Sequence, residues 1–381
     1  MLPTVNPDAM LFYGFSIIAG LIFLLGHGSI FIALVNRLHS TAIPRPVIKT
    51  IDVCWQVIAF GTPILIAACC LQYITLRVQP SLSDPVTRWI AAYVGLCFFA
   101  AGWSVADRFL RATEVKTTEL LLTNHTEVAA MQKNIGHRPT GDLLTEFCSR
   151  LPLNEIFDLS IHEKEIRLPR LPSALEGLRI THLTDLHMTG QLTRSFYEEL
   201  VRKANEWESD LVLITGDIVE KKRCLDWLEP TLGKLQAKSG VYYVLGNHEL
   251  RLKNESLART SLSGAGLIDM GHQWRQVECR GESILLIGNE LPWFKPAADM
   301  ATCPTEVDGK RAFRILLTHS PDQLSWAREH DCDLMVAGHT HGGQVRLPLI
   351  GPILAPSWQG SRFASGTFYY EPTLMLSLIH I

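Results

Sequence analysis

Residues 337–345 read AGHTHGGQV, and their first residue, Ala337, ends a short and mostly apolar run at 333–337. In this stretch His339 and His341 lie between glycines, separated from each other by a single residue. Imidazole is a common ligand of transition metals, and two imidazoles on such a tight turn are difficult to explain without an ion. A short apolar run bounded by turn residues is typical of a buried strand. The stretch therefore predicts a strand end that contributes to a metal site.

Four more polar clusters follow predicted strands farther upstream. They are Asp185-Leu-His187, Gly216-Asp217, Gly246-Asn247-His248-Glu249 and Thr318-His319. Carboxylate, carboxamide and imidazole groups together suit divalent ions such as manganese, iron or zinc, and no cluster offers a thiolate. Taken singly, an Asp or Asn after a strand is as often a helix cap or turn former. Taken together, the clusters offer enough ligands for two ions that share one carboxylate.

Strands and helices alternate in the prediction for the part of the chain after residue 152. The expected strands cover residues 157–161, 166–168, 178–183, 211–215, 241–245, 284–288, 314–318 and 333–337, and the expected helices cover 196–207 and 225–235. This alternation predicts an α/β fold with a layered sheet, helices outside it and ligand groups at the strand ends. The glycines that precede Asp217, Asn247 and His339 would allow sharp turns and a close approach to the ions.

The five clusters, in this order, resemble the signature of the calcineurin-like metallophosphoesterase superfamily. The stretch 337–345, with LLTHSPD at 316–322 before it, resembles more narrowly the membrane-associated bacterial branch. The resemblance covers roughly residues 154–375. It implies a layered β-sandwich flanked by helices, of the αββα type.

The resemblance also implies a dinuclear metal centre. One ion would be held by Asp185, His187, Asp217 and His341, and the other by Asp217, Asn247, His319 and His339. Asp217 would bridge the two ions, which would activate a hydroxide for attack on a phosphate ester or a pyrophosphate bond. His248 matches the family's catalytic histidine that binds no metal, and it would protonate the leaving group or stabilise the phosphoryl oxygens. Glu249 is expected to orient a ligand rather than to bind an ion.

The N-terminal part of the chain has a different composition. Residues 1–105 hold eight of the 73 Asp, Glu, Lys and Arg side chains. Three runs without a charge, at 9–36, 53–76 and 89–106, contain 28, 24 and 18 residues. A helix of about 20 apolar residues crosses a bilayer. We therefore expect transmembrane helices at about 10–35, 53–76 and 89–106, within an anchor that covers residues 1–112.

A connector, residues 113–153, is expected to contain a short apolar run and two modest helices. The second helix carries Leu143, Leu144, Phe147 and Leu151 at helical spacing. This apolar face would either pack on the catalytic domain or lie at the bilayer surface.

Basic residues near the spans predict the orientation of the anchor, because Lys and Arg resist translocation. One side would carry six of them and the other side two; the six are Arg37, Arg45, Lys49, Arg108, Arg111 and Lys116, and the two are Arg77 and Arg88. This asymmetry predicts a multi-pass protein whose catalytic domain lies in the cytoplasm, and the resemblance to the bacterial branch implies the bacterial inner membrane. Nine cysteines without a CxxC pair agree with a reducing compartment.

The function expected from the sequence is that of a membrane-anchored, metal-dependent phosphoesterase. Its substrate would be a phosphate ester or a lipid-linked phosphate, and a net charge of -3 gives no basic footprint for nucleic acid. The alternative is a membrane-bound binding or scaffold module that keeps the fold without catalysis. Residues 376–381 match what a common sequencing adapter encodes, and we expect them to be a tail that is not native.

Overall fold

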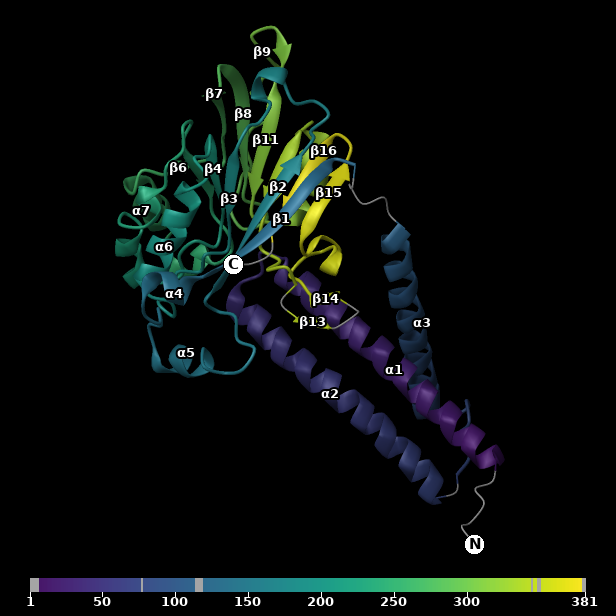
Figure 1. Ribbon diagram of the computed structural model, residues 1–381. Coiled ribbons are helices and arrows are strands. Elements are labelled where there is room, and N and C mark those ends of the chain that lie inside the picture. The colour runs from purple at the N-terminus through teal and green to yellow at the C-terminus, as the bar shows by residue number, and fades with distance from the viewer. Residues whose placement is uncertain (1–6, 77, 114–118, 344, 348–350, 379–381) are drawn as a thin grey trace. The chain divides into compact units, whose positions relative to one another are not determined.

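The computed structural model describes residues 7–76, 78–113, 119–343, 345–347 and 351–378. The chain divides into two compact units, Met1–Glu114 and Val115–Ile381. The first unit consists of the helices α1 (Pro7–His39), α2 (Arg45–Leu76) and α3 (Pro85–Thr113) (Figure 1). Each contains a segment long and apolar enough to cross a membrane: Gly14–His39, Arg45–Leu76 and Pro85–Leu110. The prediction of three apolar N-terminal helices that could span a membrane is confirmed.

His27 of α1 contacts both of the other helices. Its Nδ1 atom lies 2.6 Å from the hydroxyl of Tyr93 in α3, and its Nε2 atom lies 2.7 Å from the carbonyl oxygen of Ala59 in α2. Because a carbonyl oxygen only accepts, Nε2 donates and Nδ1 accepts from the tyrosine. Both ring nitrogens are thus satisfied within apolar surroundings. One residue earlier, Gly26 lies so close to α3 that an added Cβ would be 1.7 Å from the carbonyl oxygen of Cys97.

The second unit is built on two sheets. The smaller sheet has the order β3-β4-β5-β6 and is parallel throughout. The larger sheet has the order β15-β16-β12-β11-β8-β7, with β16, β12, β11 and β8 parallel and an antiparallel strand at each edge. Their bounds are β3 (Ile180–Leu183), β4 (Leu211–Thr215), β5 (Val241–Val244), β6 (Ile268–Asp269), β7 (Trp274–Cys279), β8 (Glu282–Asn289), β11 (Phe313–Thr318), β12 (Leu334–Ala337), β15 (Gly366–Tyr370) and β16 (Thr373–Ser377).

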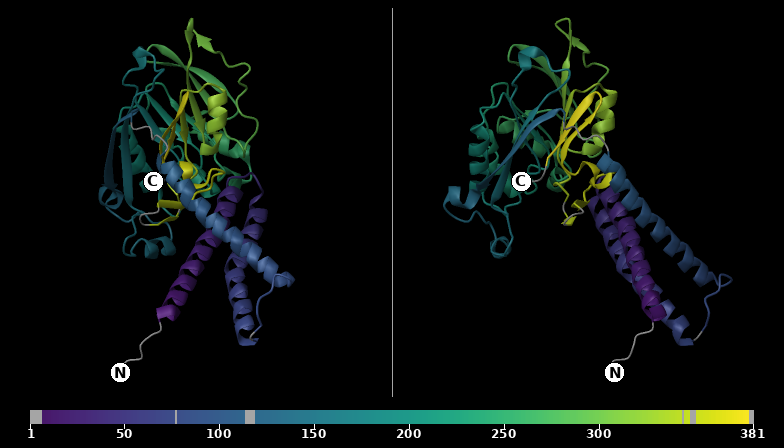
Figure 2. Two further views of the ribbon diagram at one scale, coloured as in Figure 1. Left: turned by 90° about the vertical axis from the view of Figure 1, so that its right-hand side faces the viewer. Right: turned by 45° about the vertical axis from the view of Figure 1, so that its right-hand side comes forward.

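Apolar residues alternate between the two faces of each sheet, as the period of a strand requires. In β4, Leu211 and Leu213 face the core between the sheets, together with Ile315 of β11. Val212 and Ile214 point the other way and pack with residues of α6 (Arg194–Asn205) and α7 (Glu255–Gly264). The outer face of the larger sheet is covered by α8 (Leu324–Glu329). The expected β-sandwich flanked by helices is therefore confirmed (Figure 2).

The remaining elements are short or lie at the margins of the sandwich. They are β1 (Leu121–Ala130), α4 (Met131–Ile135), α5 (Leu143–Cys148), β2 (Asp158–Ile166), β9 (Glu306–Val307), β10 (Lys310–Arg311), β13 (Val345–Leu347), β14 (Gly351–Leu354) and the 3₁₀ helices η1 (Ser173–Leu175), η2 (Lys222–Trp227), η3 (Leu232–Lys234), η4 (Glu249–Leu252), η5 (Pro321–Gln323) and η6 (Gly360–Phe363).

Two local predictions were wrong, and one strand was not predicted. The two modest helices expected in the connector correspond to α4 and α5, but the strand β1 before them was not expected; its Thr and Val residues pair with β2 in a long antiparallel hairpin. The two strands expected at 157–161 and 166–168 are one continuous strand, β2. The helix expected at 225–235 is replaced by η2 and η3 because Pro230, which lacks an N–H, interrupts the run.

The segment expected to be a non-native tail begins inside the larger sheet. Leu376 and Ser377 belong to β16, where Leu376 pairs with Val336 of β12 and Thr367 of β15. Residues 379–381 of that expected tail lie outside the described residues.

Candidate metal centre

Five loops at the carboxyl ends of strands bring the predicted site residues together. Asp185 and His187 follow β3, Asp217 follows β4, Asn247 and His248 follow β5, His319 follows β11, and His339 and His341 follow β12. The first three loops come from the smaller sheet and the last two from the larger sheet. Because all five strands run in parallel within their sheets, their carboxyl ends meet at one edge of the sandwich.

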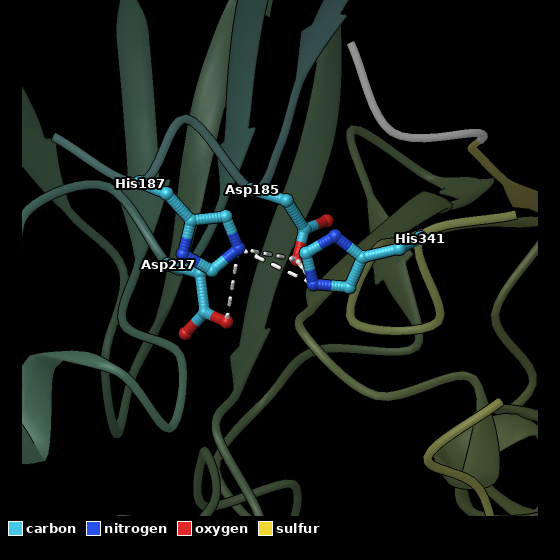
Figure 3. A group of neighbouring side chains, drawn as sticks. All are labelled: Asp185, His187, Asp217 and His341. Carbon is cyan, nitrogen blue, oxygen red and sulfur yellow. Dashed lines mark hydrogen bonds and ion pairs between the residues drawn. The ribbon is translucent and has the colours of Figure 1, made fainter. Parts of the chain in front are cut away.

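The first group comprises Asp185, His187, Asp217 and His341, whose ligand atoms all lie within 4.8 Å of one another (Figure 3). The Nε2 atom of His187 is 3.9 Å from both Asp185 Oδ1 and Asp217 Oδ2. The Nε2 atom of His341 is 3.5 Å from Asp185 Oδ1 and 3.2 Å from Nε2 of His187. Two imidazole nitrogens and two carboxylates thus converge on one point, as the ligands of a single ion do.

The second group comprises Asp217, His319 and His339, again with ligand atoms within 4.8 Å of one another. The Nε2 atom of His319 lies 3.2 Å from Asp217 Oδ2 and 3.1 Å from Asn247 Oδ1. Asp217 therefore belongs to both groups. The structure brings all seven predicted ligands together in two sets that share this carboxylate.

Unsatisfied polar atoms show that these residues fit metal ions. Asp217 Oδ2 and His339 Nε2 are buried and, within the described part of the chain, have no hydrogen-bond partner of acceptable geometry. The Nδ1 atom of His319 lies 2.6 Å from the carbonyl oxygen of Thr215 and so must donate to it. Nε2 of His319 faces the second group, and it would bind an ion through its lone pair after giving up the proton that it carries beside Asp217. Buried atoms without a partner are costly, and a divalent ion would satisfy them.

The backbone at the site is unusual. Five of the seven predicted ligands, namely Asp185, His187, Asp217, His339 and His341, have a positive φ, between 45° and 71°. This left-handed region is unfavourable for residues other than glycine, and such residues concentrate at functional sites. A Cβ on Gly246 would lie 2.4 Å from Asp217 Oδ1, so this glycine is required for the close approach of two loops.

The charges of the site are balanced between carboxylates and imidazoles. Burial opposes the ionisation of Asp185 and Asp217, but the nearby imidazoles outweigh it and lower the pKa of both carboxyl groups. Burial alone would also lower the pKa of His319, yet the contact with Asp217 raises that pKa to about 9. Burial, together with the positive charge of His319, lowers the pKa of His339 well below its usual value. Neutral His339 is therefore ready to bind a metal ion.

Glu249 holds two of these loops together and belongs to neither group. Its carboxylate accepts hydrogen bonds from four backbone N–H groups, those of Asp217, Ile218, Val219 and Gly246. These bonds fix the loop after β4 against the loop after β5. Glu249 is thus placed to orient the predicted ligand Asp217.

Glu220 and Arg251 were missed by the sequence analysis. Glu220 Oε1 accepts a hydrogen bond from His187 Nδ1 at 2.7 Å and a very short one from His248 Nδ1. Glu220 Oε2 pairs with the guanidinium of Arg251, which also lies 2.9 Å from His248 Nε2. Burial opposes ionisation of Glu220, but these partners lower the pKa of its carboxyl group. The signal available in the sequence was the position of Glu220, a charged residue directly after the apolar pair Ile218 and Val219.

His248 lies at the edge of the two groups. Its Nε2 atom is 3.9 Å from Asp217 Oδ2, and its ring centroid is 4.5 Å from that of His187. Both ring nitrogens are engaged, one by Glu220 and one by Arg251. His248 is thus held beside the proposed ions without belonging to either group.

Comparisons with known proteins agree with this site. Residues 178–343 match the calcineurin-like phosphoesterase family. The chain is 25% identical to an uncharacterized metallophosphoesterase, YkuE, of Bacillus subtilis over 54% of this chain and 72% of the relative. It is 29% identical to the phosphodiesterase YaeI of Escherichia coli over 49% of this chain and 69% of the relative.

The name of a third relative describes a transmembrane protein that has a metallophosphoesterase domain. The chain is 29% identical to a transmembrane protein with metallophosphoesterase domain of Danio rerio, over 48% of this chain and 44% of the relative. The chain therefore carries a calcineurin-like phosphoesterase domain. With its cluster of metal-ligating residues, this domain is that of a metal-dependent phosphoesterase that uses divalent ions.

Proposed function

We propose that the protein is a membrane-anchored phosphoesterase that hydrolyses a phosphate ester or a pyrophosphate bond with two divalent ions, manganese, iron or zinc. Residues 1–112 would form the anchor and residues 154–375 the catalytic domain. Asp185, His187, Asp217 and His341 would hold one ion, and Asp217, Asn247, His319 and His339 the other. The observation that carries this proposal is the shared carboxylate of Asp217, whose Oδ2 atom is buried without a hydrogen-bond partner among the described residues.

When bound, the ions would supply a nucleophile at neutral pH and neutralise charge on the phosphate. The protein's own residues would perform the other tasks. In the structure Nε2 of His248 accepts from Arg251. Once the Arg251 guanidinium turns to the substrate's phosphate and Nε2 takes up a proton, His248 would donate that proton to the leaving-group oxygen, or a hydrogen bond to a phosphoryl oxygen. Glu220 would hold the ring of His248 in place through Nδ1, and the guanidinium of Arg251 would attract the substrate's phosphate.

The substrate is proposed to be a phosphate carried by a lipid or by a lipid-linked nucleotide. This proposal is supported by the three apolar helices, which are long enough to span a membrane and would tether the catalytic domain to it. We also propose that the protein is a multi-pass protein of the bacterial inner membrane. The excess of basic residues in the first loop and after the third span supports an orientation with the domain in the cytoplasm. Protease added to sealed spheroplasts would then leave the domain intact, whereas protease added to inverted vesicles would digest it.

The activity is tested with the purified full chain in detergent. With added manganese, it should hydrolyse bis(p-nitrophenyl) phosphate or p-nitrophenyl phosphate, and elemental analysis should find bound metal. Asp217→Ala and His339→Ala should each abolish turnover, whereas His137→Ala, at an exposed position outside the site, should not. No turnover together with no bound metal would favour the non-catalytic scaffold. Activity that survives Asp217→Ala would contradict the assignment of the ligands.

A further inference from the structure

A group of apolar side chains on and after α5 is exposed. We call this group the α5 patch; its members and exposed fractions are Leu143 (89%), Leu144 (69%), Phe147 (63%), Leu151 (48%), Leu153 (100%) and Ile156 (38%). Single exposed apolar residues are common on protein surfaces, but six within fourteen consecutive residues are not. Such a concentration marks a surface that contacts another apolar body.

Polar contacts, rather than burial of the patch, hold this segment in shape. Asp142 caps α5 by accepting from the backbone N–H of Thr145 at 2.8 Å. Glu146 accepts from the hydroxyl of Thr140 at 2.6 Å, and Arg138 donates to Ser149 Oγ at 2.8 Å. The segment therefore forms without using its apolar side chains as a core.

Leu153 is the most exposed residue of the α5 patch. Its side chain is fully exposed and its backbone has a φ of 65°, a conformation that is unfavourable for a leucine. Neither burial within the described fold nor backbone preference accounts for a leucine at this position. An apolar partner outside the chain would account for it.

The patch is joined directly to the loop that carries two of the proposed ligands. The N–H of Gly141 donates to the carbonyl of Gln191 at 2.7 Å, and the N–H of Thr193 donates to the carbonyl of Pro139 at 2.9 Å. Thr140 forms an isolated β-bridge with Leu192. Backbone hydrogen bonds thus join the loop after His187 to the segment that leads into α5.

The patch also lies at the same end of the domain as the site. The β9–β10 hairpin precedes the amino end of β11, and His319 follows the carboxyl end of that strand. Figure 1 shows α5 at the end of the domain opposite β9.

We infer that the α5 patch inserts into the surface of the lipid bilayer, with its six apolar side chains among the upper acyl chains. A bilayer is the fitting partner because the same chain has three helices that could span a membrane, which would keep the domain close to lipid at a high effective concentration. Charge plays no part in the attraction. Residues 131–156 contain three basic and three acidic side chains, so insertion depends on apolar contact alone.

Photo-crosslinking of the full chain in nanodiscs tests this inference. Nanodiscs of phosphatidylcholine with a small fraction of a diazirine-labelled phosphatidylcholine are irradiated, and lipid adducts are mapped by mass spectrometry. We expect adducts on the peptide that contains residues 143–156, in addition to those on the spans. The yield should be unchanged when phosphatidylglycerol replaces a third of the lipid, because insertion does not depend on charge.

The variant Leu143→Ser/Leu144→Ser/Phe147→Ser/Leu153→Ser should lower the yield on that peptide by about tenfold, with the adducts on the spans as internal reference. The matched control is Leu122→Ser, because Leu122 is exposed (44%) and lies at the far end of β1 from α4. Both variants should keep the melting temperature of the domain. Adducts on the spans but none on residues 143–156 of the unaltered chain would overturn the inference. Crosslinks from the patch to a second copy of the chain in place of lipid would also overturn it.

Discussion

The Nδ1 atom of His187 donates a hydrogen bond to Oε1 of Glu220 across 2.7 Å. Through this bond a residue that touches no proposed ion fixes the tautomer of a proposed ligand, because Nε2 of His187 is left without a proton. The same carboxylate oxygen fixes the ring of His248. One side chain thus positions a metal ligand and the proposed proton donor together.

Glu220→Gln should therefore weaken metal binding and catalysis at once. The amide cannot accept two imidazole N–H bonds on a charged oxygen, so we expect metal affinity and kcat/KM to fall about 10-fold to 100-fold. Metal titration and steady-state kinetics would measure the two effects. Glu198→Gln is the matched control, because Glu198 pairs with Arg194 of the same helix, α6, and its side chain is partly exposed. Equal loss in both variants would contradict a specific role of Glu220.

Gly246→Ala should impair the site by steric overlap. The new Cβ would lie 2.4 Å from Asp217 Oδ1 and 2.5 Å from the Asp217 backbone nitrogen, which cannot both move aside. We expect a loss of about 1–3 kcal/mol in the free energy of unfolding and a loss of bound metal. Gly264→Ala, in α7 with open space around the new Cβ, should leave stability and metal content nearly unchanged. Thermal melts would measure the stability of both variants, and elemental analysis would measure their metal content.

Asp210→Asn should remove a contribution to stability that depends on pH. The Asp210 carboxylate accepts from the backbone N–H of Arg179 at 2.9 Å and pairs with Lys238 and Arg280. Burial opposes ionisation, but these partners outweigh it and lower the pKa of Asp210. The contribution is therefore present above the unfolded pKa of about 4 and is lost as pH falls through the lower folded value.

At pH 7 the unaltered chain should be more stable than Asp210→Asn by about 1–2 kcal/mol. The difference should shrink as the pH falls below about 4. Urea denaturation curves of the two chains at a series of pH values would measure it. A difference that stays constant down to the lowest pH would show that the carboxylate charge contributes nothing.

Gly26→Ala should loosen the first unit. A Cβ at this position would lie 1.7 Å from the carbonyl oxygen of Cys97, so α1 and α3 would have to separate. Gly20→Ala meets nothing within 4 Å and serves as the control. We expect the Gly26 variant alone to lose thermal stability in detergent. Equal melting temperatures of the two variants would show that the contact does not hold the helices together.

Sequence patterns predicted the parts of the fold in which local signals agree. Short apolar runs such as 211–215 are buried strands, and the polar clusters that follow them converge because parallel strands end at one edge. The strand at 121–130 was not predicted because Asn124 is a poor strand former and β1 is stabilised by pairing with β2. The role of Glu220 was hidden because only the folded loop brings it between His187 and His248.

The proposed ligands are divided between the two layers of the sandwich, since they follow β3, β4 and β5 in one sheet and β11 and β12 in the other. Bound ions would therefore crosslink the two layers, which are otherwise joined by an apolar interface. A gene broken anywhere between the codons of Asn247 and His319 would leave an incomplete set of ligands in each fragment. Neither fragment could form the metal centre alone, so duplication of only half of the domain would not produce a second centre.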